Sequence, residues 1–226
     1  MASLTEHLAS AVASLIGHGG LPGTLPESPV RMFRDWFEDA AASGKYDDPN
    51  AMVLATSTPE GRPSARVVLC KQIDDQPPSI VFFTNYQSRK GDELTRNPYA
   101  ACVMHWPHAQ RQVRIEGRAE LLDSAASDAY FASRALLSKL GAWASHQSQP
   151  LQSRGQLVQQ VAAEAARHGV DMLSAGSARI PRPPHWGGFR LVIERLELWQ
   201  GVQGRLHDRA VWTRKGDGWE STRLQP

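Results

Sequence analysis

Cysteine, net charge and long hydrophobic runs are all scarce in this chain of 226 residues. The two cysteines, Cys70 and Cys102, lie in apolar runs, so we expect reduced core residues and no disulfide framework. The net charge is only +2, with 25 Lys and Arg against 23 Asp and Glu, which gives no overall argument for nucleic-acid binding. Any anion must therefore be bound by a local cluster of basic side chains.

The N-terminus lacks the features of a targeting segment. It has no basic start, and Glu6 and His7 interrupt an apolar stretch that is far too short to cross a membrane. We therefore expect a cytoplasmic protein with no membrane partner. Residues 1–30 also contain no arginine, lysine or tyrosine. No side chain in this stretch can therefore offer a ligand a guanidinium, an ammonium or a phenol group.

Hydrophobic spacing predicts two N-terminal helices followed by a series of strands. Apolar residues from Leu4 to Ile16 recur at helical spacing, and a Gly- and Pro-rich linker leads to a second helix with Ser28 as its cap and Pro29 at its first position. The later elements are expected as strands at 51–57, 64–73, 79–85, 99–106 and 111–122, a short helix at 88–98, a helical block at about 124–168, and more strands from 187 onward.

This order of elements predicts a mainly β protein of the α+β class. Closely spaced strands with short turns suggest an antiparallel sheet or small barrel that carries helices on its outside. A chain of this length suits one sizeable core. We therefore expect an N-terminal helix and linker at 1–28 and a single domain at 29–226.

Two clusters of polar residues are candidates for binding an anion. Arg89 and Lys90 open the short helix, where free N–H groups and the helix dipole favour a phosphate; a capped helix with solvated cations is the alternative. Tyr130, Arg134 and Ser138 are spaced i, i+4, i+8, so one continuous helix would place two hydroxyls and a guanidinium on one face. The alternative there is a tyrosine that packs on an arginine stem.

Other spacings say less about chemistry. Arg66 and Lys71, five residues apart in one apolar run, are expected on opposite faces of a strand. His105 and His108 have no evident third ligand, so we expect no metal site. The chain has no G-x-G-x-x-G or Walker loop, which argues against a Rossmann or P-loop nucleotide site.

Seven motifs, in this order, resemble the pyridoxine (pyridoxamine) 5′-phosphate oxidases, which are FMN enzymes of vitamin B6 metabolism. They are "RVVLCK", "FFTNYQSRKG", "RQVRIEG", "YFASR", "GAWASHQS", "WGGFRL" and "LWQGVQGRLHDR", with "RLQP" at the C-terminus. The resemblance covers 29–226 and implies one FMN-binding split β-barrel oxidase domain with peripheral helices. It also implies a homodimer with FMN at the subunit interface, and oxidation of pyridoxamine or pyridoxine 5′-phosphate to pyridoxal 5′-phosphate while O2 becomes H2O2.

The same resemblance assigns roles to individual positions. Contacts with FMN are implied for Arg66, Val67, Val68, Leu69, Cys70, Lys71, Phe83, Thr84, Arg89, Lys90, Gln112, Gln147, Ser148, Trp199 and Arg209. Contacts with the substrate phosphate are implied for Lys71, Tyr130, Arg134 and Ser138, and a catalytic pair over the substrate ring for Arg205 and His207. We expect this pair on one side of an extended segment, after a tight turn at Gly201 and Gly204, with Asp208 paired to a cation.

The chain departs from the family pattern at two places. The family's N-terminal segment supplies an arginine and a tyrosine over the substrate, which residues 1–30 lack, and "ALLS" follows "YFASR" where the family commonly has proline and arginine. Three alternatives stay open: a related oxidase of the phenazine-pathway type, a non-catalytic FMN or pyridoxal-phosphate binding protein, and an interaction domain. The phosphate residues argue against the first, Arg205 and His207 argue against the second, and a colourless purified protein would favour the third.

Overall fold

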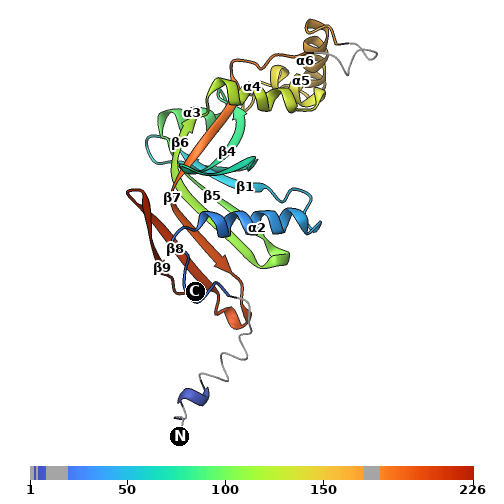
Figure 1. Ribbon diagram of the computed structural model, residues 1–226. Coiled ribbons are helices and arrows are strands. Elements are labelled where there is room, and N and C mark those ends of the chain that lie inside the picture. The colour runs from blue at the N-terminus through green and yellow to red at the C-terminus, as the bar shows by residue number, and fades with distance from the viewer. Residues whose placement is uncertain (1–2, 4, 9–19, 171–178) are drawn as a thin grey trace.

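The computed structural model describes residues 3, 5–8, 20–170 and 179–226 (Figure 1). Most of the first expected helix lies outside these ranges. Its described part, residues 5–8, is helical. The strands are β1 Ala51–Ser57, β2 Pro63–Leu69, β3 Gln72–Asp75, β4 Pro78–Asn85, β5 Tyr99–Trp106, β6 Arg111–Leu121, β7 Trp186–Gln200, β8 Asp208–Lys215 and β9 Gly218–Arg223. The helices are α2 Val30–Ala42, α3 Arg89–Arg96, α4 Ser124–Ser133, α5 Leu136–Ala144 and α6 Arg154–Arg167, with 3-10 turns η1 Pro107–Ala109 and η2 Gln203–Arg205.

All the strand pairs are antiparallel, and the long strand β7 organises them. The order is β2-β1-β5-β6-β7-β4-β3, with the hairpin β8–β9 added through β8 to β7. The first half of β7 pairs with β4 and its second half pairs with β8, while β6 follows it along most of its length. A bulge at Glu116/Gly117 bends this pair, and a Cβ at Gly117 would collide with the backbone oxygen of Val192.

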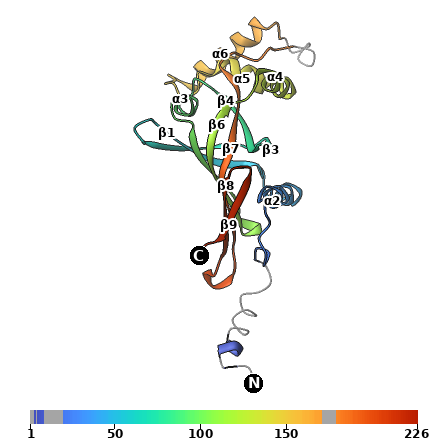
Figure 2. The ribbon, with the colours of Figure 1, turned by 60° about the vertical axis from the view of Figure 1, so that its left-hand side comes forward.

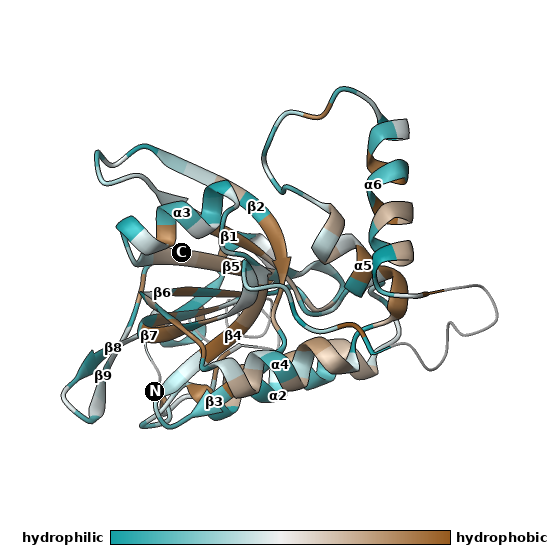
Figure 3. Ribbon diagram, turned by 90° about the horizontal axis from the view of Figure 1, so that it is seen from above, coloured by the Kyte–Doolittle hydropathy of each residue, from teal (hydrophilic) through white to brown (hydrophobic). Residues whose placement is uncertain are grey.

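Helices and hairpin occupy different ends of this sheet. Figures 1 and 2 show α4, α5 and α6 at one end and the β8–β9 hairpin at the other, with α2 lying alongside the strands. Figure 3 shows apolar stretches in the strands, among them β4 and β7, whose residues are mostly buried. Within the described ranges, no helix is long and apolar enough to cross a membrane.

Helix α2 covers the main core as its pattern predicts. Val30, Phe33, Trp36 and Ala40 are buried. The helix begins one residue later than expected, because the first helical hydrogen bond runs from the N–H of Phe33 to the oxygen of Pro29, which makes Pro29 the cap. The hydroxyl of Ser28 accepts only a long bond, 3.4 Å, from the N–H of Val30.

One other expectation was wrong in detail. The run 64–73 is not one strand: β2 ends at Leu69, and the N–H of Cys70 bonds to Asn50 while that of Lys71 bonds to Val81, so the chain passes from one strand partner to another. The helical block expected at about 124–168 is confirmed, and it consists of three helices. The cysteines are free and buried as expected, and burial raises the pKa of the Cys70 thiol to about 12.

Candidate active site

A cavity of about 790 Å³ lies where β2 and β4 meet helices α4 and α5. It brings together many residues that were singled out from the sequence, namely Arg66, Val67, Val68, Leu69, Lys71, Phe83, Thr84, Lys90, Tyr130, Arg134, Ser138 and Gln147. Arg66 and Lys71 therefore face one cavity, although strand alternation predicts opposite faces. The reason is the end of β2 at Leu69, which interrupts the alternation between them.

The cavity lining holds several cations, and the nearest carboxylate, that of Glu93, lies behind the lining. Arg66, Lys71, Lys90 and Arg134 are all in its lining, and the lining that the described ranges provide contains no Asp or Glu. Like charges around one concave surface raise the local concentration of anions. The arrangement therefore suits a ligand with phosphate or carboxylate groups.

Lys90 is held inside by the start of helix α3. The hydroxyl of Ser88 caps the helix by accepting from the N–H of Gly91, at 3.3 Å. The Lys90 ammonium is buried and donates to Gln147 at 2.7 Å and to Ser88 at 3.2 Å. Burial, and then repulsion from Arg66, lowers the pKa of Lys90 to about 8.

Binding of a phosphate is therefore expected to weaken as the pH rises through about 8, because Lys90 loses the proton that attracts the anion. Below that value the ammonium is charged, and the phosphate itself becomes a dianion above about pH 6. Affinity for a phosphorylated flavin, such as the FMN that the family motifs imply, should therefore be highest between these two pH values. Fluorescence titration from pH 6 to 9.5 measures this. Lys90→Arg keeps its charge throughout and should flatten the profile above pH 8; an equally flat profile in the parent protein would contradict the expectation.

The segment that carries Tyr130, Arg134 and Ser138 is not one helix. Helix α4 ends at Ser133, Arg134 and Ala135 are extended, and α5 starts at Leu136. The break has a packing reason, since Phe131 and Leu140 are buried in the same small core with Ile180 and Trp186. Residues nine apart on a straight helix point about 180° apart, so only a break lets both of them reach that core.

Arg134 lies over an aromatic wall at the cavity. Its guanidinium carbon is 4.5 Å from the centre of the Trp186 ring, and Phe83 stacks on Tyr130 with ring centres 3.8 Å apart. Burial lowers the pKa of the guanidinium. Its Nη1 is buried and has no hydrogen-bond partner among the residues described. A buried donor of this kind is costly to leave unpaired, so a ligand acceptor is expected there.

Six residues implied as cofactor contacts do not line this cavity, and three of them, Cys70, Arg89 and Ser148, belong to segments next to it. Cys70 is fully buried in the main core. Arg89 and Ser148 line a separate hollow of about 550 Å³, and the side chain of Arg89 pairs with Glu93 at 2.9 Å. Arg89 points away because neighbouring residues on a helix diverge by about 100°, and Lys90 takes the inward direction.

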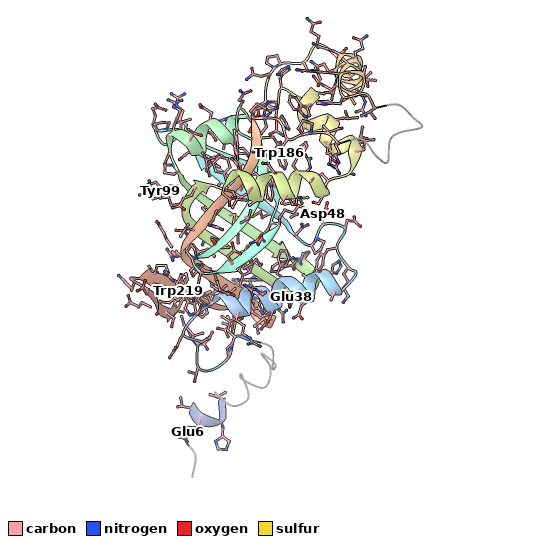
Figure 4. The ribbon with its side chains drawn as sticks, turned by 45° about the horizontal axis from the view of Figure 1, so that its top comes forward. Glu6, Glu38, Asp48, Tyr99, Trp186 and Trp219 are labelled. Carbon is pink, nitrogen blue, oxygen red and sulfur yellow. The ribbon has the colours of Figure 1, made fainter. Side chains whose placement is uncertain are left out.

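Gln112, Trp199 and Arg209 form a row at the other end of β7. They are direct cross-strand neighbours on β6, β7 and β8. Trp199 comes 13 residues after Trp186 on the same strand, which corresponds to roughly 43 Å at about 3.3 Å per residue. Figure 4 marks Trp186 beside α4 and α5, and Figure 1 shows the turn η2 at the opposite end of β7. The two groups are therefore far apart within one chain.

The turn that carries Arg205 and His207 differs from the expected extended segment. Gly204 and Arg205 both have positive φ, at 72° and 61°, and this pair of left-handed residues reverses the chain. His207 packs on Trp199 with ring centres 4.6 Å apart, and its Nδ1 accepts from the N–H of Val202 at 3.3 Å, which places the proton of the neutral ring on Nε2.

The expected tight turn and the expected partner of Asp208 are confirmed. A Cβ at Gly201 would lie 2.8 Å from the Cβ of Gln110, so only glycine fits there. Asp208 pairs with Arg223 at 2.6 Å and accepts from the N–H of Leu21 at 2.8 Å. The contact between Asp208 and Leu21 therefore holds the C-terminal end of the turn against the N-terminal linker.

Sequence reasoning gave no role to several residues that shape the site. Asn85, Ser145 and Trp186 line the cavity, and Glu93 is buried behind it. Trp186 lies in one of the motifs, but nothing in its spacing marks it as a wall for Arg134. The separation i, i+4 between Arg89 and Glu93 predicts an ion pair, yet it gives no sign that the carboxylate is buried.

Comparison with known proteins identifies the family. Residues 38–168 match the family described as pyridoxamine 5′-phosphate oxidase, and 186–226 match the pyridoxine 5′-phosphate oxidase C-terminal dimerisation region. The chain is 49% identical over 198 residues to a pyridoxine/pyridoxamine 5′-phosphate oxidase of Rubrobacter xylanophilus, covering 88% of this chain and 87% of that protein. It is 48% identical over 202 residues to a protein of the same name from Gluconobacter oxydans, covering 89% and 96%.

Solved structures agree with this assignment. A PhzG protein of Burkholderia lata, determined in complex with tetrahydrophenazine-1-carboxylic acid, superposes with a TM-score of 0.79 at 34% identity over 89% of this chain and 94% of that one. A pyridoxamine 5′-phosphate oxidase-related, FMN binding protein of Nostoc punctiforme shares the fold, with a TM-score of 0.66 at 20% identity over 88% and 98%. The expected family and fold class are thus confirmed: the chain belongs to the pyridoxamine 5′-phosphate oxidase family of oxidoreductases and has its split-barrel fold.

Proposed function

We propose that this protein is an FMN-dependent oxidase that converts pyridoxamine or pyridoxine 5′-phosphate to pyridoxal 5′-phosphate. One observation carries the proposal: four cations line a cavity whose lining, as far as it is described, holds no acid, and one of them, Arg134, has a buried donor with no partner among the described residues. A cofactor and a substrate that each bear a phosphate suit such a cavity. The family and its similar relatives support the reaction class.

The residues present fit FMN and a phosphorylated substrate side by side. Arg66 and Lys90 would hold the cofactor phosphate, and the set Lys71, Tyr130, Arg134 and Ser138 would hold the substrate phosphate. When bound, FMN would supply the redox chemistry, as acceptor of the hydride from C4′ with O2 as the final acceptor that becomes H2O2. With the amine substrate, water would then hydrolyse the resulting imine to the aldehyde and ammonia. The chain's own part is to fix both phosphates and keep the substrate ring over the flavin.

We infer that a second copy of the chain completes each site. Val53 and Val67 are 44% and 64% exposed, and Val53 is in register with both Val67 and Val103, which gives an apolar face across β2, β1 and β5. Exposed apolar sheet faces of this kind are typical of subunit contacts, and residues 186–226 match a dimerisation region. The partner of a homodimer would bring its own turn with Arg205 and His207 to the cavity. That pair would orient the substrate ring and manage its proton.

The N-terminal residues 1–19 are expected to add less than about tenfold to kcat/KM, because residues 1–30 offer no arginine, lysine or tyrosine to the substrate. Deletion should stop before Gly20. Leu21 is buried, and the carbonyl of Pro26 accepts from the Trp212 indole at 2.8 Å, so removing 1–27 would also destabilise the fold by about 2–4 kcal/mol. Steady-state kinetics and thermal unfolding of both truncations test this; a larger loss with 1–19 removed would reveal a substrate contact there.

A second candidate is an oxidase of reduced phenazine carboxylic acids, since the PhzG structure superposes closely. The visible spectrum of the purified protein, followed by peroxide release, distinguishes the two. A yellow protein that releases H2O2 with pyridoxamine 5′-phosphate supports our proposal. Release only with a reduced phenazine carboxylic acid favours the second candidate, and a colourless protein that takes up no FMN argues against both.

A further inference from the structure

We propose that Glu93 is a positioning residue for Arg66. It acts through the hydroxyls of Thr56 and Ser64, which hold the guanidinium at the cavity wall in the orientation that receives the cofactor phosphate. The inference rests on the proposed function, because it takes this cavity as the FMN site.

The carboxylate of Glu93 is the centre of a buried network behind the cavity. Its side chain is only 4% exposed, although glutamate on a short surface helix is usually solvated. One oxygen, Oε2, accepts from the hydroxyl of Ser64 at 2.6 Å and from that of Thr56. The other, Oε1, accepts from the Nε of Arg89 at 2.9 Å. Helix α3 is thereby joined to both β1 and β2.

The charge of Glu93 decides the direction of these bonds. Burial alone would raise the pKa of this carboxyl, but hydrogen bonds from Ser64, Thr56 and Arg89 together lower it to about 2. An ionised carboxylate can only accept, so each hydroxyl must give it its single proton. The oxygen lone pairs of Thr56 and Ser64 are then free to accept from another donor.

That donor is the guanidinium of Arg66. Its Nη1 lies 2.5 Å from the Thr56 hydroxyl, and its Nη2 lies 2.5 Å from the Ser64 hydroxyl. The direct approach of Nη2 to Glu93 is longer, at 3.4 Å, so the carboxylate acts mainly through the two hydroxyls. Two short bonds to oriented hydroxyls, with a longer one from Nη1 to the carbonyl of Leu54 at 3.2 Å, fix the plane of the guanidinium. Within the described ranges no acceptor bonds its Nε–H, which leaves that donor to a ligand.

Arg89 completes the network from the solvent side. Its side chain is 60% exposed and does not line the cavity, but its Nε holds the outer oxygen of Glu93. In this chain Arg89 therefore acts on the phosphate end through Glu93, as the charge partner of the buried carboxylate. It balances Glu93 without competing for the hydroxyls that orient Arg66.

The test compares two flavins in the full-length protein. Riboflavin has the flavin ring but no phosphate, so a residue that positions Arg66 should affect FMN alone. Glu93→Gln is expected to raise the Kd of FMN at least about tenfold and to change the Kd of riboflavin less than about twofold. The amide oxygen carries no full negative charge, so it accepts hydrogen bonds from the two hydroxyls more weakly than the carboxylate does. Asp92→Asn is the matched control: it neutralises an exposed carboxylate on the same helix and should change neither Kd.

A double-mutant cycle with Arg66→Ala decides whether Glu93 acts through Arg66. In that background Glu93→Gln should change the Kd of FMN less than about twofold. Equal weakening of FMN and riboflavin, or the same loss with and without Arg66, would overturn the inference in favour of a purely structural role. If Glu93→Gln does not fold, Ser64→Ala keeps the carboxylate and should still raise the Kd of FMN about threefold to tenfold; no change would overturn it. A parent protein that binds neither flavin refutes the proposed function itself.

Discussion

Arg134→Ala is expected to lower kcat/KM for pyridoxamine 5′-phosphate by about a hundredfold or more, equivalent to roughly 2.7 kcal/mol of transition-state stabilisation. The guanidinium is held over Trp186, and its Nη1 has no acceptor within the described ranges, so it is ready to receive a dianionic phosphate. Removing it leaves the substrate phosphate in the cavity without its forked partner. Steady-state kinetics with FMN-saturated protein measures the loss.

Arg134→Lys is the matched control for this prediction. It keeps the charge but loses the planar fork and the stacking on the aromatic wall, so its kcat/KM should fall between those of the parent and the alanine variant. FMN content, read from the visible spectrum, should stay at the parental level in both. Parental kcat/KM in Arg134→Ala would refute the assignment of the phosphate site and favour a substrate without phosphate.

Mixing two impaired variants is expected to restore about a quarter of the parental activity. One variant carries Arg134→Ala, and the other carries Arg205→Ala with His207→Asn, which alone should lower kcat/KM about tenfold or more while FMN stays bound. If each site combines the cavity of one chain with the turn of its partner, a mixed dimer has one site with both defects and one intact site. Random exchange gives about half mixed dimers, hence about a quarter of the sites intact.

The outcome separates a shared site from a site within one chain. A site built from one chain would stay defective in every mixture, so the activity would remain at the mean of the two variants. Light scattering on FMN-loaded protein should give the mass of a dimer before and after mixing, and a monomer mass would refute the shared site directly. Co-expression with two affinity tags provides mixed dimers if spontaneous exchange is slow.

The sequence predicted most elements of the fold because their signals are local. Apolar runs bounded by turn residues located β1, β4 and β5, and the stripe of Val30, Phe33 and Trp36 located helix α2. The sequence could not show where one helix or strand ends and the next one begins. The break after Ser133 depends on Phe131 and Leu140 sharing one core, and the end of β2 at Leu69 depends on pairing with Asn50 and Val81. Both are tertiary effects that override local periodicity.

For the candidate site too, the sequence predicted some features and could not predict others. Family motifs named the residues that line the cavity, but they did not show that Gln112, Trp199 and Arg209 lie at the other end of β7. The burial of Glu93 could not be read from its sequence, since a glutamate four residues after an arginine on a helix is usually exposed. Position along a strand and burial of a charge are properties of the assembled sheet.

The central place of β7 has a consequence for how the chain is made. Val81 of β4 pairs with Arg190, about a hundred residues later, so a ribosome must synthesise most of the protein before this pairing can form. Until β7 emerges, β4 and β6 each present an unpaired apolar edge, a state prone to association with other chains. We therefore expect a chain that stops before residue 186 to aggregate, and the growing polypeptide to need shielding late in translation.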